Sequence, residues 1–301
     1  MKEITWSASR IGNYKGCALR YYYTYVNKFI SNIPVNTVYA DKGTVFHNTV
    51  EKWASEITDK EKLKALLKEN CEKYNIIDGD PTPLSKDDPK KIQTYNESRA
   101  LELFFTFWEK WVQPKLDKGY SFKQEIKFNP LINNKKFTGA LDLLIEPVNN
   151  DDTIYVVDYK SGAEIHVEDY RLQQILYAYF LGNERGWDIP KTAEKVKLYI
   201  FGPFSEKKRV ISEEDKMLSC MKEIKYTSEE MQEIINDYMG TIAEINTIDW
   251  DNVDVDKLGK YSHKCTWCPY LGSIARGDFK GCKCSYDMGF RQSRGVVFSK
   301  P

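Results

Sequence analysis

The chain has 301 residues, and its 44 basic and 44 acidic side chains give a formal net charge of zero. Hydrophobic residues make up 42% and charged residues 29%, which is typical of a soluble globular protein and excludes a disordered one. No run of about 18 apolar residues predicts a membrane helix. The polar N-terminus Met1–Trp6 also lacks the apolar region of a signal peptide. We therefore expect a cytoplasmic protein, and its zero net charge limits any nucleic-acid binding to a local basic surface.

The seven cysteines are an odd number, which does not suit a fully paired, secreted disulfide framework. Cys17, Cys71 and Cys220 are isolated. The other four crowd into one C-terminal stretch: Cys265, Cys268, Cys282 and Cys284. In a reducing compartment, such crowding indicates metal ligation.

Four helices are predicted within the first 120 residues. Ser7 is the expected N-cap of the first helix, and the breaker-rich segment Asp78–Pro83 separates the third helix from the fourth. The fourth helix carries an apolar stripe that includes Phe104 and Trp108. The predicted helices cover residues 7–30, 42–57, 59–75 and 89–112.

Strands are predicted from residue 121 onward. Alternating or β-branched residues indicate three successive strands, with a turn at Asn149–Asp152, and a helix and a fourth strand follow. These elements cover residues 121–128, 136–146, 153–160, 167–181 and 196–201. A further strand is expected at 221–226, and then a helix capped by Ser228. The order is helix, three strands, helix, strand, which is an α+β fold with a helical insertion.

Charged residues lie within three of these apolar elements. Gly43, His47 and Glu51 are spaced by four residues on a helix, which places them on one face. Asp142 follows Gly139 inside an apolar strand, and Asp158 and Lys160 end the next strand on one face.

Two buried carboxylates on neighbouring strands repel each other unless a positive charge lies between them. A divalent cation with oxygen ligands meets this need, and Lys160 beside it could orient an attacking water. The alternative for Asp158 and Lys160 alone is a surface ion pair at the sheet end. The joint pattern favours phosphodiester hydrolysis.

Gln173 and Tyr177 lie one turn apart in the helix after Lys160. Alone they are an ordinary polar pair. In this place in the chain, they are also candidates for contacting the substrate or positioning the lysine.

This pattern resembles the PD-(D/E)xK nuclease superfamily, and in particular its RecB-like branch. That branch includes the nuclease domains of recombination complexes and the CRISPR-associated adaptation exonucleases. The residues that carry the resemblance are Gly43, His47, Asp142, Asp158, Lys160, Gln173 and Tyr177. It implies an α/β restriction-endonuclease-like core, αβββαβ, within one nuclease domain. The core would cover residues 38–57 and 120–203, with residues 58–118 as the helical insertion.

The resemblance also implies roles. His47, Asp142, Asp158 and the backbone carbonyl of Tyr159 would ligate Mg²⁺ or Mn²⁺, and Lys160 would assist the attacking water. Glu51 would support His47 or only cap a polar face.

The cysteines fit two kinds of metal centre, and the alternative to both is that they are free thiols. Taken alone, the C-terminal four fit a Zn²⁺ knuckle. The segment around Cys17 also resembles RecB-like nucleases that hold a [4Fe–4S] cluster, which would join residues 1–30 to residues 260–290. The ligands would then be Cys17, Cys265, Cys268 and either Cys282 or Cys284. The fourth cysteine departs from the family spacing, because Ile274 stands where that ligand is usual.

We therefore expect a metal-dependent DNA nuclease, an exonuclease on single strands or duplex ends, that acts in recombination, repair or phage or CRISPR-type DNA processing. A recombination, replication or CRISPR-adaptation protein would be a partner. Arg20, Tyr21 and Tyr177 are candidates for nucleic-acid contact, although the tyrosines could equally pack on the core. The alternatives are a catalytically silent nuclease fold that binds DNA or assembles with other proteins, and a zinc-dependent nucleic-acid-binding protein.

Overall fold

The computed structural model describes residues 4–28, 38–77, 81–83, 92–94, 97–149, 153–162, 164–205, 212–254 and 258. The chain divides into two compact units. One consists of Thr37–Ile234, and the other combines Met1–Asn36 with Ile235–Pro301. Among the described helices, none is both long and apolar enough to cross a membrane.

A five-stranded sheet forms the centre of the unit Thr37–Ile234. Its strands, in spatial order, are β10 (Met221–Ile224), β9 (Val196–Phe201), β8 (Ile154–Tyr159), β7 (Gly139–Pro147) and β4 (Tyr120–Phe128). Only β8 and β9 run parallel, and the other neighbours are antiparallel. The parallel pair requires a crossover, which α7 (Val167–Glu184) and α8 (Ile189–Lys195) provide. With α3 (Val38–Val50) before the sheet, the order αβββαβ is confirmed.

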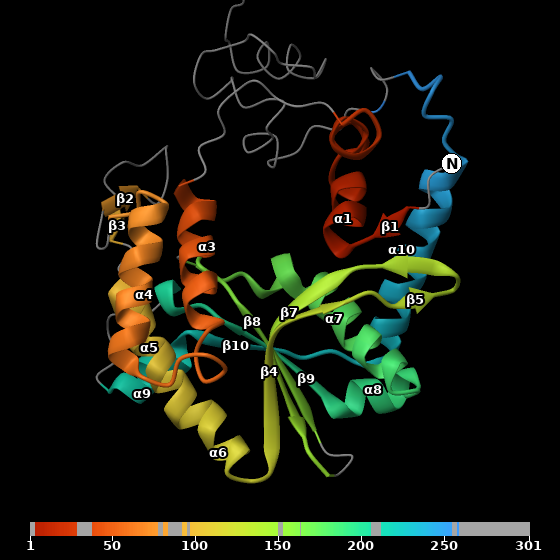
Figure 1. Ribbon diagram of the computed structural model, residues 1–301. Coiled ribbons are helices and arrows are strands. Elements are labelled where there is room, and N and C mark those ends of the chain that lie inside the picture. Colours follow the sequence, from red (N-terminus) through yellow and green to blue (C-terminus); the bar gives the residue numbers. More distant parts are fainter. Residues whose placement is uncertain are drawn as a thin grey trace, which may run out of the picture. The chain divides into compact units, whose positions relative to one another are not determined.

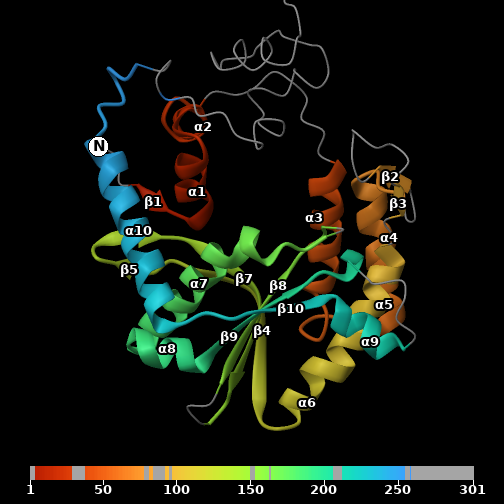
Figure 2. The same cartoon turned by 180° about the vertical axis from the view of Figure 1, so that it is seen from behind.

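Helices cover both faces of this sheet (Figures 1 and 2). On one face lie α3, α4 (Lys60–Lys73), α5 (Glu97–Phe107), the π-helical turn Trp108–Val112 and α6 (Gln113–Leu116); α7 and α8 lie on the other. The core on the α3 face is rich in aromatic side chains. There Phe107 stacks on Phe201, with ring centroids 4.5 Å apart, and Phe46 packs edge-on against Tyr159. The core therefore fixes α3 against the end of β8.

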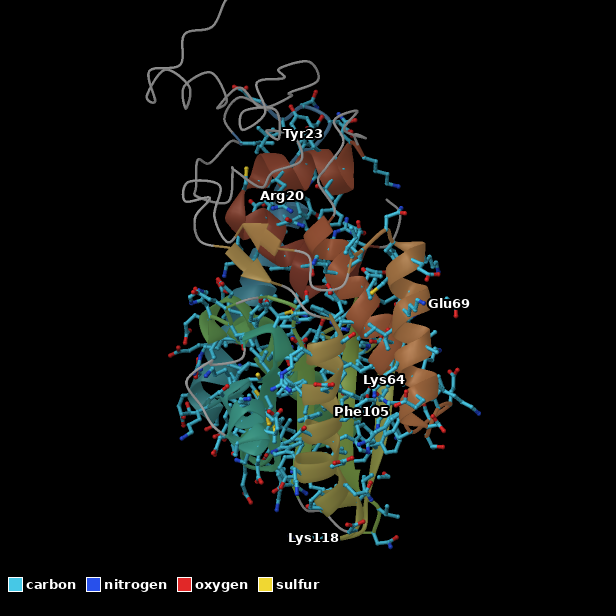
Figure 3. All side chains as sticks on the ribbon, turned by 90° about the vertical axis from the view of Figure 1, so that its left-hand side faces the viewer. Arg20, Tyr23, Lys64, Glu69, Phe105 and Lys118 are labelled. Carbon is cyan, nitrogen blue, oxygen red and sulfur yellow. The ribbon has the colours of Figure 1, made fainter. Side chains whose placement is uncertain are left out.

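Helix α4 of the insertion is amphipathic. Asp59 caps it by accepting hydrogen bonds from the backbone N–H groups of Glu61 and Lys62. Leu63 and Leu67 are buried. Lys64 and Glu69 lie on the exposed side of the helix (Figure 3).

Short elements complete this unit. Helix α9 (Glu213–Ser219) is joined to α5 by an ion pair between Glu213 and Arg99, 2.7 Å long. Two hairpins pair β2 (Pro81–Pro83) with β3 (Ile92–Thr94), and β5 (Leu131–Ile132) with β6 (Lys135–Phe137). A 3₁₀ turn covers Pro203–Ser205.

Two helix predictions are corrected at their ends. The helix predicted over 42–57 covers Val38–Val50, because Ala54 adopts a left-handed φ of 61° and its N–H bonds to the carbonyl of Ile57. The helix predicted over 89–112 starts only at Glu97, because residues 90–96 carry no apolar stripe to bury; Ile92–Thr94 forms β3 instead.

The strand predictions are confirmed except for three details. The strand predicted at 221–226 ends at Ile224. Residues 136–146 form two strands, β6 and β7, which Thr138 separates. Lys160 lies one residue beyond β8, although its N–H still bonds to the carbonyl of Phe201 at 3.0 Å. Helices α8 and α9 were not predicted.

The second unit contains β1 (Thr5–Trp6), α1 (Ala8–Gly16), α2 (Ala18–Tyr21), the π-helical turn Tyr22–Val26 and the part of α10 (Ser228–Thr247) after Ile234. Ser7 caps α1 as predicted, by accepting from the N–H of Arg10. The single helix predicted over 7–30 is wrong: Cys17 is extended, after the poor helix former Gly16. The N-cap of α10 is Thr227 rather than Ser228, because the hydroxyl of Thr227 accepts a hydrogen bond from the N–H of Glu230.

Candidate active site

The site begins at a gap in the sheet beside Asp142. The ladder between β7 and β8 ends at the pair Leu143 and Val157, so that Asp142 and Asp158 stand directly beyond it. The ladder between β7 and β4 also skips Asp142. A carboxylate oxygen of Asp142 takes over one of the missing bonds and accepts from the N–H of Tyr159 at 2.6 Å. The end of the hairpin therefore fixes the orientation of Asp142.

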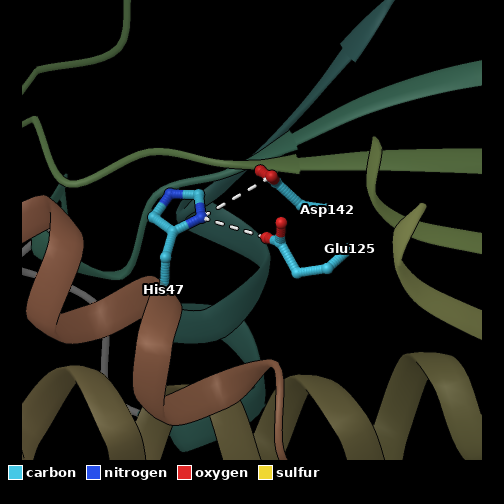
Figure 4. A group of neighbouring side chains, drawn as sticks. All are labelled: His47, Glu125 and Asp142. Atoms are coloured by element: carbon cyan, nitrogen blue, oxygen red, sulfur yellow. Dashed lines mark ion pairs between the residues drawn. The ribbon is translucent and has the colours of Figure 1, made fainter. Parts of the chain in front are cut away.

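His47 reaches this gap from α3. Its Nε2 lies 3.0 Å from the carbonyl oxygen of Tyr159, and because a carbonyl only accepts, this contact makes Nε2 the protonated nitrogen. The other nitrogen, Nδ1, faces Asp142 at 3.6 Å and Glu125 at 3.9 Å (Figure 4). A histidine fixed in this way presents the free lone pair of Nδ1 to a metal ion.

Glu125 is the third member of this group. It lies on β4, directly across from Asp142 in the register that pairs Phe128 with Gly139, and it has a left-handed φ of 48°. This conformation is strained for glutamate. One ligand atom each from His47, Glu125 and Asp142 lie within 4.8 Å of one another.

Asp158 and Lys160 lie next to this group. Their side chains lie on one face, as the alternation of strand side chains predicted, and they form the ion pair that was the alternative reading of these two residues. Asp158 is buried, and its pair with Lys160 supplies the cation that a buried carboxylate requires.

Burial and repulsion shift the acid–base behaviour of the group. Burial, together with the charge of Asp158, raises the pKa of Asp142 to about 7. Burial lowers the pKa of His47, but the carboxylates of Glu125 and Asp142 outweigh it and raise that pKa above its usual value. Burial likewise opposes the charge of Lys160, while Asp158 and Asp142 raise its pKa. The site thus has an excess of negative charge that a metal ion would neutralise.

Close approach of backbone elements shapes the site. A Cβ on Gly43 would lie 2.8 Å from Oγ of Ser161, so glycine lets α3 approach the segment after Lys160. A Cβ on Gly139 would lie 2.9 Å from the ring of Tyr177 and 2.6 Å from that of Phe128. The hydroxyl of Tyr177 in turn accepts a hydrogen bond from the side-chain amide of Gln173 at 2.9 Å.

Other candidate residues lie elsewhere. Glu51 follows the end of α3 and pairs with Lys52 at 3.6 Å, outside the group around His47. The carbonyl of Tyr159, a candidate metal ligand, bonds to His47 and keeps a second lone pair.

The candidates for nucleic-acid and cluster binding in the first 30 residues belong to the other unit. Arg20 is half-buried. Tyr21 is only 1% exposed and packs on Tyr14 and Trp250, which is the core packing that was the alternative to base stacking. Cys17 is partly exposed with a free thiol. The predicted ligands Cys265, Cys268, Cys282 and Cys284 lie outside the described residues.

Residues 5–273 match the profile of the PD-(D/E)XK nuclease superfamily. The chain belongs to this superfamily. The αβββαβ order, Asp142 within β7, and Asp158 and Lys160 at the end of β8 are the features by which the sequence resembles this family.

Solved structures resemble the chain only distantly. A protein from Eubacterium rectale described as a "putative exonuclease" is 11% identical, with a TM-score of 0.44, and the match covers 99% of this chain and 90% of that one. The structure of SSO0001 is also 11% identical, with a TM-score of 0.31, and the match covers 80% of this chain and 96% of that one. No curated protein matches significantly.

Glu125 was not among the metal ligands predicted from the sequence, although it lies with His47 and Asp142. A charged residue inside a strand was the available signal, but Lys123, Gln124 and Lys127 give that strand several polar positions. Only the register with β7 distinguishes Glu125, because it places this residue opposite Asp142.

Proposed function

We propose that this chain is a metal-dependent DNA nuclease of the RecB-like branch, an exonuclease on single strands or duplex ends. The observation that carries the proposal is the convergence of His47, Glu125 and Asp142 within 4.8 Å, beside the pair of Asp158 and Lys160. An imidazole nitrogen and carboxylate oxygens are donors that suit Mn²⁺, and the carboxylates suit Mg²⁺.

The chemistry of the donor set fits such an ion. Two carboxylates and the Nδ1 atom of His47 converge on one point, and burial with mutual repulsion raises the pKa of Asp142. Asp158 would complete the ligands once it turns from Lys160. When bound, Mg²⁺ or Mn²⁺ would lower the pKa of a coordinated water and neutralise negative charge on a phosphate.

The protein's own residues then account for the remaining steps. Tyr159 holds Asp142 and His47 in place through its backbone N–H and carbonyl. Lys160 places its ammonium group next to Asp158, where it can hold the attacking water or the phosphate oxygens. Gln173 and Tyr177 form a hydrogen-bonded pair on α7 that would contact the DNA strand.

The proposed test is cleavage of DNA labelled at the 5′ or the 3′ end, single-stranded and duplex, with Mn²⁺ or Mg²⁺ and with or without a chelator. Metal-dependent, stepwise shortening from an end is the expected result. Lys160→Ala and Asp158→Asn should each reduce the rate by about 10²- to 10⁴-fold, the usual contribution of a positioned catalytic group. Glu168→Gln, an exposed substitution on α7, is the matched control.

Two outcomes would contradict the proposal. Equal cleavage by wild type and both site variants would exclude this site as its source. DNA binding without cleavage would indicate a catalytically silent nuclease fold that serves DNA binding or assembly with recombination, replication or CRISPR-adaptation proteins.

We also propose that Cys17, Cys265, Cys268 and Cys282 or Cys284 hold a [4Fe–4S] cluster. The support is the count and spacing of the cysteines and the free thiol of Cys17. Protein purified without air should absorb at about 400 nm through cysteinyl-bound iron. Cys17→Ser should remove this band, and Cys71→Ala should keep it. Colourless protein that contains zinc would establish the zinc alternative instead.

A further inference from the structure

Tyr170 lies beside the lysine of the site, and neither the sequence pattern nor the family match points to it. Its ring centroid is 5.0 Å from Nζ of Lys160, within the range of a cation–π interaction. Burial raises the pKa of Tyr170, so its ring is a neutral phenol at physiological pH. A neutral ring attracts an ammonium group through its face without adding a charge.

Tyr170 belongs to the face of α7 that looks toward the site. Gln173 and Tyr177 follow it by three and seven residues, which places all three side chains along one side of the helix. Asp158 and Lys160 act electrostatically on both Tyr170 and Tyr177. The row of polar side chains on α7 therefore extends one turn further toward its N-terminus than Gln173 and Tyr177 alone suggest.

The ring of Tyr170 is important because Lys160 and a metal ion would compete for the carboxylate of Asp158. In the structure, the carboxylate of Asp158 is paired with Lys160. If Asp158 is to bind a metal ion, its carboxylate is drawn to that ion, and the ammonium of Lys160 loses part of its partner while the ion repels it. Lys160 is a flexible side chain and would otherwise swing toward water.

We propose that Tyr170 is a positioning residue for Lys160, and that the face of its ring holds the lysine ammonium at the site when Asp158 turns to the metal. This inference rests on the proposed nuclease function. The inference assigns the positioning of Lys160 to the ring of Tyr170 and none of it to the phenolic hydroxyl. A role in binding DNA would instead act on the substrate.

The kinetic test compares Tyr170→Leu with the conservative variant Tyr170→Phe. The structure predicts that Tyr170→Leu lowers kcat about 3- to 30-fold, the range that a partly desolvated cation–π contact can supply. KM should stay within about twofold, because the ring acts on Lys160 and leaves substrate binding alone. Tyr170→Phe should restore kcat to within about twofold of wild type, since it keeps the ring. Thermal unfolding of the three proteins identifies any loss of fold.

A second measurement does not depend on activity. In protein labelled with ¹³C at lysine Cε, the signal of Lys160, assigned by its absence from Lys160→Arg, should be shifted upfield by the ring of Tyr170. The shift should persist in Tyr170→Phe and disappear in Tyr170→Leu.

The outcomes separate this inference from the proposed function. A raised KM with unchanged kcat in Tyr170→Leu would assign the ring to DNA stacking, and equal losses in both variants would assign the effect to the hydroxyl. Either result overturns the inference, as does an unshifted Lys160 signal in an active nuclease. An inactive wild-type protein with the shifted signal would contradict the nuclease function and the positioning role of Tyr170 in it, and would support only the contact between Tyr170 and Lys160.

Discussion

At the scale of single residues, Asp142 determines the chemistry of this site. It is an acid at a position that the ladder with β4 skips and where the ladder with β8 has ended, so its side chain takes over a backbone bond there. Its burial would be unfavourable without a cation, and the raised pKa expresses that cost. The residue is thus suited to bind a metal ion rather than to stabilise the fold.

Glu125 gives the first prediction. Because its carboxylate faces Nδ1 of His47 together with Asp142, Glu125→Gln should weaken Mn²⁺ binding by about 10- to 100-fold, as the loss of a ligand or of its close support does. Calorimetric titration of the purified protein with Mn²⁺ measures this. Glu69→Gln, on the exposed side of α4, is the control, and equal affinity of the two variants would exclude Glu125 from the metal group.

The pH dependence of metal binding gives the second prediction. Only the ionised form of Asp142 binds a metal ion, so protons compete with the ion and affinity rises with pH. With a pKa of about 7, the ionised fraction of Asp142 grows from about a tenth at pH 6 to about nine tenths at pH 8. Mn²⁺ affinity should therefore rise at least about tenfold over this interval, with proton release at pH 6 that calorimetry in two buffers detects. Constant affinity would contradict the raised pKa.

At the scale of elements, the site depends on how closely β7 approaches α7. Gly139 begins β7 at the point where the rings of Phe128 and Tyr177 pack edge-on, with centroids 5.2 Å apart. Both rings are buried. This explains in physical terms why a glycine precedes Asp142 by three residues.

Gly139→Ala is the third prediction. The new Cβ would overlap both rings, which should lower the free energy of unfolding by about 1–3 kcal/mol, as overpacking of a core does, and displace Tyr177 from Gln173. Chemical denaturation and the nuclease assay measure the two effects. Gly240→Ala in α10 meets open space and should be neutral or stabilising, so equal effects of the two substitutions would refute the packing argument.

The elements themselves were largely predictable, and the misses have local causes. Strands β4, β8 and β9 follow from the alternation and the β-branched residues of their sequences. The end of α3 and the break at Cys17 did not follow, because a left-handed Ala54 and an extended Cys17 leave no sign in apolar periodicity.

At the scale of the whole molecule, segments from the two ends of the chain form one compact unit. Tyr14 donates a hydrogen bond to Glu244 at 2.7 Å, and Lys15 forms an ion pair with Asp237. Trp250 packs on Tyr21 and Tyr22, with centroids 5.4 and 6.1 Å away. These contacts join residues more than 200 positions apart in the sequence.

Trp250→Ala is the fourth prediction. Loss of this ring should destabilise the unit by about 1–3 kcal/mol, less than for a fully buried tryptophan because Trp250 is half-buried. Hydrogen exchange should accelerate in the backbone of α1 and leave β8 unchanged. Trp250→Phe keeps a ring and should show a smaller effect, and equal exchange in all three proteins would exclude Trp250 as the link.

The sequence by itself determined the αβββαβ order and the family. It also identified His47, Asp142, Asp158 and Lys160 as candidate site residues, because these signals depend on the local spacing of residues along one strand or helix. Only the tertiary structure decided that Glu125 joins His47 and Asp142, and that the ring of Tyr170 lies on Lys160. Both depend on strand register and on how a helix is rotated against the sheet, and many long-range contacts set these together. The zero net charge of the chain is compatible with this acidic site, since basic residues elsewhere balance its carboxylates.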